Sequence, residues 1–92
     1  MSAQELAAKY IVAMEKTLRN VQRTTASVAV SKECIDEIFG YVEAYLEDAK
    51  YFLSQGKFET SLVSIAYCEG LLDALKLINA VNVSVTEKSV SY

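Results

Sequence analysis

The chain has 92 residues, 52% of them apolar, and a formal charge of −3 at pH 7. This length suits one small domain, and the acidic balance makes general binding to nucleic-acid phosphates unfavourable. No apolar run approaches the ~20 residues that span a bilayer, and the segment MSAQELAAKY lacks the pattern of a signal peptide, so we expect a cytoplasmic protein without a membrane span.

The first predicted helix covers residues 3–24. Proline is absent and glycine occurs only three times, so little interrupts long helices and an all-α domain is expected. Ser2 and Glu5 have the spacing of a capping box at the start of this helix. One face is apolar and is therefore predicted to face the core. It consists of Leu6, Ala7, Tyr10, Ile11, Ala13, Met14, Leu18 and Val21, opposite Lys9, Lys16, Arg19 and Arg23.

The second predicted helix covers residues 32–55. It follows the β-branched segment TTASVAV, and Ser31 has the position of its N-cap. Its outer face carries six acidic residues against Lys32 and Lys50, a net charge of −4. The inner face is apolar with a helical period. It consists of Ile35, Ile38, Val42, Tyr45, Ala49 and Phe52, broadened by Phe39, Leu46 and Leu53.

The third predicted helix covers residues 58–79 and follows a tight turn in which Gly56 takes the left-handed C′ position. The second and third helices therefore form an antiparallel hairpin, and residues 1–80 are predicted to form a three-helix, up-and-down antiparallel bundle. Residues 81–92 alternate valine with polar residues but have no strand to pair with. We expect them to be a flexible, disordered C-terminal tail, or otherwise a segment that orders against a partner.

The third helix carries two apolar rows rather than one. The first row contains Phe58, Ile65, Leu72 and Leu75, with Cys68 between them, and should face the rest of the domain. The small residues of the second row would let another helix approach closely, so we predict a homodimer through it. The alternative is that the first two helices reach far enough round to bury it. This second row, the glycine seam, consists of Val63, Tyr67, Gly70, Ala74 and Leu77.

A narrow polar wedge of Glu69, Asp73 and Lys76 separates the two rows. Asp73 and Lys76 are expected to form an ordinary surface pair. Glu69 lies at the edge of the predicted core, where a carboxylate needs a partner such as a tyrosine hydroxyl or Lys76.

Familiar catalytic chemistry is disfavoured because the chain contains no histidine, no phosphate-binding glycine loop and no paired-cysteine zinc motif. No catalytic residue and no cofactor is therefore predicted. A speculative alternative is a carboxylate site for a divalent cation, formed by Glu43, Glu69 and Asp73. Cys34 and Cys68 are expected about 15 Å apart along the hairpin, too far for a disulfide, and should be free thiols.

The segment GKFETSLVSIAYCEGLLDALKLI, residues 56–78, resembles the signature of a family of short archaeal proteins catalogued as domain of unknown function 357. The resemblance implies a three-helix up-and-down bundle from an archaeon, without an established activity. The resemblance is carried by Tyr67, Glu69, Gly70, Leu72, Asp73 and Leu75. It also implies that three of these motif positions, Glu69, Gly70 and Asp73, serve more than solubility.

Two functions are compatible with these features. The first is a non-catalytic interaction or scaffold module that self-associates through the glycine seam, with an unidentified protein partner possible for the acidic face of the second helix. The second is a small-ligand or divalent-metal-binding protein that uses the carboxylates.

Overall fold

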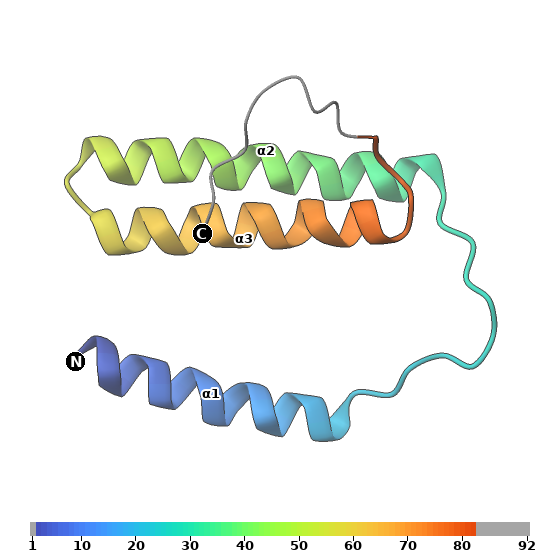
Figure 1. Cartoon of the computed structure of the whole chain (residues 1–92), viewed down its shortest axis with the longest axis horizontal. Coiled ribbons are helices and arrows are strands. Elements are labelled where there is room, and N and C mark those ends of the chain that lie inside the picture. Colours follow the sequence, from blue (N-terminus) through green and yellow to red (C-terminus); the bar gives the residue numbers. More distant parts are fainter. Residues whose placement is uncertain (1, 83–92) are drawn as a thin grey trace.

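Three helices in up-and-down order form the fold in the computed structural model, which describes residues 2–82 (Figure 1). They are α1 (Ala3–Asn20), α2 (Lys32–Ser54) and α3 (Phe58–Leu77). Within the described residues there is no strand, so the predicted all-α, three-helix fold is confirmed. No helix of this part of the chain is long and apolar enough to cross a membrane. Of the predicted C-terminal tail, residues 83–92 lie outside the described residues.

Helix α1 begins as predicted and ends four residues early. The Ser2 hydroxyl accepts a hydrogen bond from the backbone N–H of Glu5 at 3.1 Å and thereby caps the first turn. At the other end, Val21 has extended backbone angles, and the side-chain amide of Asn20 donates to the carbonyl of Lys16. The β-branched residues that follow disfavour further helix. The helix therefore stops at Asn20 rather than at Thr24.

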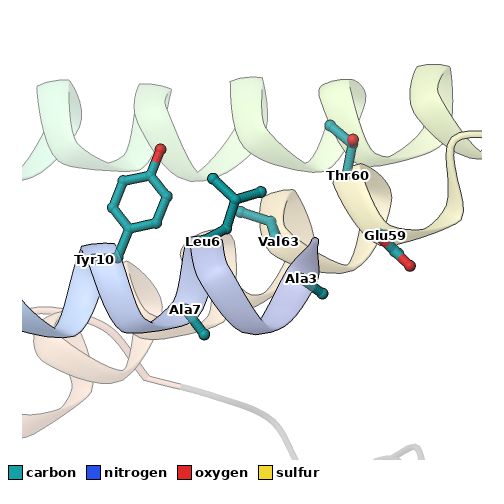
Figure 2. A pocket seen from close by; sticks show the side chains of 7 residues that line it. All are labelled: Ala3, Leu6, Ala7, Tyr10, Glu59, Thr60 and Val63. Atoms are coloured by element: carbon teal, nitrogen blue, oxygen red, sulfur yellow. The ribbon is translucent and has the colours of Figure 1, made fainter. Parts of the chain in front are cut away.

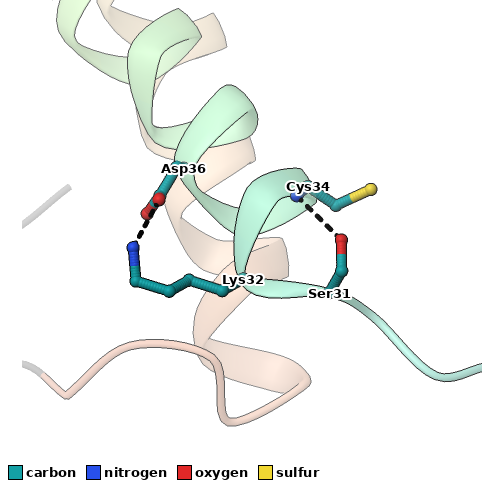
Figure 3. Close-up of polar contacts among 4 residues, drawn as sticks. All are labelled: Ser31, Lys32, Cys34 and Asp36. Atoms are coloured by element: carbon teal, nitrogen blue, oxygen red, sulfur yellow. Dashed lines mark hydrogen bonds and ion pairs between the residues drawn. The ribbon is translucent and has the colours of Figure 1, made fainter.

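Helix α2 starts at the predicted cap. The Ser31 hydroxyl accepts a hydrogen bond from the backbone N–H of Cys34 at 3.1 Å, and an exposed ion pair joins Lys32 to Asp36 at 2.8 Å (Figure 3). Because the cap satisfies a backbone donor that would otherwise lack a partner, it fixes where the helix begins.

The turn between α2 and α3 is a Schellman motif with Gly56 at φ +73°. The N–H of Gly56 donates to the carbonyl of Leu53 at 3.1 Å, and the N–H of Lys57 donates to that of Phe52 at 2.9 Å. The predicted left-handed glycine is therefore confirmed. The end of α3 repeats the motif with Asn79 at φ +59° in the glycine position.

Helices α2 and α3 pack against each other in a register set by two side chains of α3. The Ser61 hydroxyl donates to the carbonyl of Ala49 at 2.7 Å. The Cys68 thiol donates to the carbonyl of Val42 at 3.3 Å. Cys68 lies seven residues after Ser61 on α3, and Val42 lies seven residues before Ala49 on α2. Val42, Ala49, Ser64, Cys68 and Leu75 are the buried residues of this contact.

Helix α1 lies parallel to α3 on the side away from α2 (Figure 1). None of its Cα atoms comes within 8 Å of a Cα atom in α2 or α3. Tyr10, Ile11, Met14 and Leu18 are each more than half exposed. The apolar face of α1 therefore does not reach the buried contact that was predicted for it, and residues 21–31 connect the helix to the hairpin without helical structure.

Replacing Gly56 should destabilise the hairpin. We expect Gly56→Ala to lower the free energy of unfolding by about 1–2 kcal/mol, because a Cβ is disfavoured at positive φ. Gly40 is a matched control: it is helical, and a Cβ there meets nothing within 4 Å. Gly40→Ala should raise the free energy of unfolding by about 0.5–1 kcal/mol. Urea denaturation measures both changes, and equal effects of the two substitutions would contradict the assigned turn.

Candidate functional site

The glycine seam lies open on α3. Val63, Tyr67 and Leu77 are 64%, 57% and 83% exposed, and Gly70 and Ala74 are exposed as well. A Cβ built on Gly70 meets nothing within 4 Å. Much of this apolar helix face is therefore exposed in the single chain, as a self-association surface requires.

A groove of about 700 Å³ lies between the first half of α1 and the start of the glycine seam (Figure 2). Ala3, Leu6, Ala7 and Tyr10 line it from α1, and Glu59, Thr60 and Val63 line it from α3. The residues from α1 recur at helical spacing, so the apolar face of α1 points toward the seam. Helix α1 thus lies beside the seam without packing on it.

The first apolar row of α3 lies mostly where it was predicted. Cys68 and Leu75 are buried and Ile65 and Leu72 half-buried. Phe58 was expected in the same row but is 63% exposed. It is the first residue of α3, immediately after the turn, where no helix covers it.

The polar wedge divides into a surface pair and a half-buried acid. The Lys76 ammonium and the Asp73 carboxylate are 3.6 Å apart with both side chains well exposed, which confirms the expected surface pair and gives it little weight in stability. Glu69 is half-buried. Among the described residues its carboxylate makes no hydrogen bond or ion pair with a tyrosine or with Lys76, so water at the edge of the hairpin must solvate it.

Tyr67 stacks on Tyr45 of α2, a contact that the sequence did not predict. The ring centroids are 4.8 Å apart and the ring planes are inclined by 30°. Such aromatic pairs contribute about 0.5–1.5 kcal/mol beyond their buried area. Tyr67 thereby joins the glycine seam to α2.

The two cysteines are free, as predicted, and differ in environment: Cys34 is exposed and Cys68 is buried. Burial raises the pKa of the Cys68 thiol above its ordinary value of 9.0, and the negative charge of Glu69 raises it further. The thiol also donates its hydrogen bond to the carbonyl of Val42. Cys68 is therefore held as a neutral hydrogen-bond donor, and a neutral thiol is a poor nucleophile.

The speculative metal site is not assembled. In the part of the chain that the structure describes, no three Asp, Glu or Cys side chains gather closely enough to hold one ion. Glu43, Glu69 and Asp73 therefore form no ligand set, in keeping with the position of Glu43 on the exposed side of α2.

The raised pKa of Cys68 predicts a pH dependence of stability. The folded chain binds the thiol proton more tightly than the unfolded chain does, so this contribution is full below pH 9.0 and is lost as the pH rises through the higher folded pKa. We expect the free energy of unfolding to fall more steeply above pH 9 in the wild type than in Cys68→Ala.

Cys34→Ala is the control for that experiment, because Cys34 is exposed and should leave the slope unchanged. Urea denaturation at several pH values gives the slopes. Parallel curves for the wild type and Cys68→Ala would contradict the prediction.

No curated protein and no solved structure matches the chain. A family model described as "Protein of unknown function (DUF357)" matches residues 9–81, which include α2, α3 and most of α1. The match spans more than half of the chain and contains the Tyr67 to Leu75 motif. It confirms the resemblance seen in the sequence. The chain belongs to the DUF357 family of proteins of unknown function.

Proposed function

We propose that this protein is a non-catalytic, self-associating interaction module of an archaeal cytoplasm, and that two copies meet through the glycine seam of α3. The observation that carries the proposal is the exposure of the seam. Val63, Tyr67 and Leu77 are each more than half exposed, and Gly70 lies among them with open space around its Cα. Exposed apolar rows of this kind are typical of protein–protein contacts.

The small residues of the seam support a helix as the occupant. Gly70 and Ala74 are one turn apart on the same face, so the backbone of a second helix can approach there at the short end of ordinary interaxial distances. Tyr67, which stacks on Tyr45, offers an aromatic anchor beside this close approach. A second α3 meets both requirements, since it brings the same small residues and the same anchor.

The outer face of α2 is proposed to receive an unidentified, basic protein partner. Six acidic and two basic side chains on α2 give it a net charge of −4. Both lysines are engaged within the helix, since Lys32 pairs with Asp36 and Lys50 with Glu47. Complementary charge of this kind speeds encounter and selects partners more than it adds affinity.

We also propose that the protein has no catalytic role. The chain has no histidine to serve as a general base near neutral pH. Its buried thiol is held in the neutral form by its surroundings. These features support binding rather than chemistry.

The test is the mass of the full-length protein in solution. Gly70→Leu should lower the average mass of the assembly in sedimentation equilibrium, because a large side chain blocks close approach at the seam. The monomer should still fold, since a Cβ at this position meets nothing in the single chain.

Gly40→Leu is the matched control, because Gly40 is also helical and open but lies on the acidic side of α2. It should leave the mass unchanged. Self-association through the glycine seam would be refuted if Gly70→Leu had the mass of the wild type, or if the wild type were monomeric at every concentration. Repeating the measurement with magnesium should change nothing, because the proposed contact requires no cation.

A further inference from the structure

A second apolar surface lies on α2. Phe39, Leu46 and Leu53 are spaced by seven residues and are 39%, 38% and 58% exposed. We call this row the α2 stripe. The sequence predicted that these residues would broaden the buried face of the second helix. They instead lie uncovered beside the contact with α3, because α1 does not pack on the hairpin.

The start of α3 extends this surface. Val42 and Ala49 form the row of α2 that faces α3. At ~100° per residue, Leu46 and Tyr45 lie on opposite sides of that row. Leu62 and Tyr67 likewise fall on opposite sides of the row that contains Ser61 and Cys68. The stack of Tyr45 on Tyr67 identifies one common side of the hairpin. Leu46 and Leu62 must therefore share the other side.

Phe58 falls on the same side of α3 as Leu62, and the two residues are 63% and 66% exposed. The α2 stripe and these two residues thus form one apolar face of the hairpin. Helix α1 does not cover it, since the groove that α1 forms with α3 is lined by Glu59, Thr60 and Val63.

We infer that this face binds a second copy of the chain, with α2 antiparallel to α2 of the partner and Leu46 close to the two-fold axis. In that arrangement Phe39 lies opposite the partner's Leu53, and Leu53 opposite the partner's Phe39. An isologous contact requires such self-complementarity, and a stripe with equal spacing on both sides of Leu46 provides it.

Charges beside the stripe have the same symmetry. Glu43 and Lys50 are exposed, flank the stripe on the side away from α3, and lie almost equally far before and after Leu46. The antiparallel arrangement therefore brings Glu43 next to the partner's Lys50 twice in each dimer. Within one chain Lys50 has only an exposed pair with Glu47 at 3.2 Å, which is weak enough to exchange.

This interface is independent of the glycine seam, and the full-length chain can test the two together in sedimentation equilibrium. With both faces active, the wild type should form assemblies larger than a dimer. Gly70→Leu should leave a dimer held by the α2 stripe, and Leu46→Glu a dimer held by the seam. The double variant should be a monomer. Tyr51→Glu, an exposed aromatic replaced on another side of α2, should match the wild type.

Either interface can fail separately. Wild-type mass for Leu46→Glu, or a wild type that is monomeric throughout, would refute the α2 stripe. Wild-type mass for Gly70→Leu together with a lower mass for Leu46→Glu would refute the seam and leave the stripe in place.

Charge reversal tests the stripe without touching apolar packing. In the Gly70→Leu background, Glu43→Lys and Lys50→Glu should each raise the dimer dissociation constant about three- to tenfold, since each places like charges together. The combined reversal should restore the dissociation constant to within about twofold. Both residues are exposed, so the variants should fold. Additive losses in the combined variant would refute the antiparallel contact.

Discussion

The hairpin of α2 and α3 depends on one register, fixed at the turn and by two hydrogen bonds. The left-handed Gly56 reverses the chain in two residues, and Ser61 and Cys68 then donate to carbonyls of α2 at a seven-residue interval. A slip of one residue would turn each acceptor carbonyl about 100° around the axis of α2 and so would break both bonds at once. The register determines which side chains of each helix share a face, and hence where both candidate interfaces lie.

The same register leaves the hairpin with a small core. Ala49 lies level with Ser61 and Val42 with Cys68, so the helices meet through side chains of modest size. Among the described residues, Leu75 is the one large side chain that is fully buried, and it is 1% exposed. The larger apolar residues lie on the flanks, on both sides of the contact. The contact therefore leaves the apolar residues on its flanks open to another surface.

Local features were predictable from the sequence, and the neighbours of each helix were not. Ser2, Ser31 and Gly56 act within one turn of their own positions, so their patterns indicate the helix ends directly. Periodicity also separated the two rows of α3. Periodicity does not say which element covers a face. The sequence therefore predicts that the apolar face of α1 and the α2 stripe join the core, whereas both are exposed in the single chain. The stack of Tyr45 on Tyr67 depends on that same long-range register.

The motif in α3 can now be divided by physical role. Leu72 and Leu75 face α2, Tyr67 stacks on Tyr45, and Asp73 pairs with Lys76 on the surface. A Cβ at Gly70 would meet nothing within 4 Å in the single chain, although a glycine inside a helix costs about 1 kcal/mol relative to alanine.

Comparison with Gly40, which is equally open, indicates what distinguishes Gly70. The positions three, four and seven residues from Gly40 on α2 are mostly acidic, so that surface is suited to water or to a basic partner. They are Glu33, Asp36, Glu37, Glu43, Ala44 and Glu47. The corresponding neighbours of Gly70 include Val63, Tyr67, Ala74 and Leu77. An apolar row with a gap at its centre fits a helix that approaches closely, and in the single chain α1 lies beside the start of this row without packing on it.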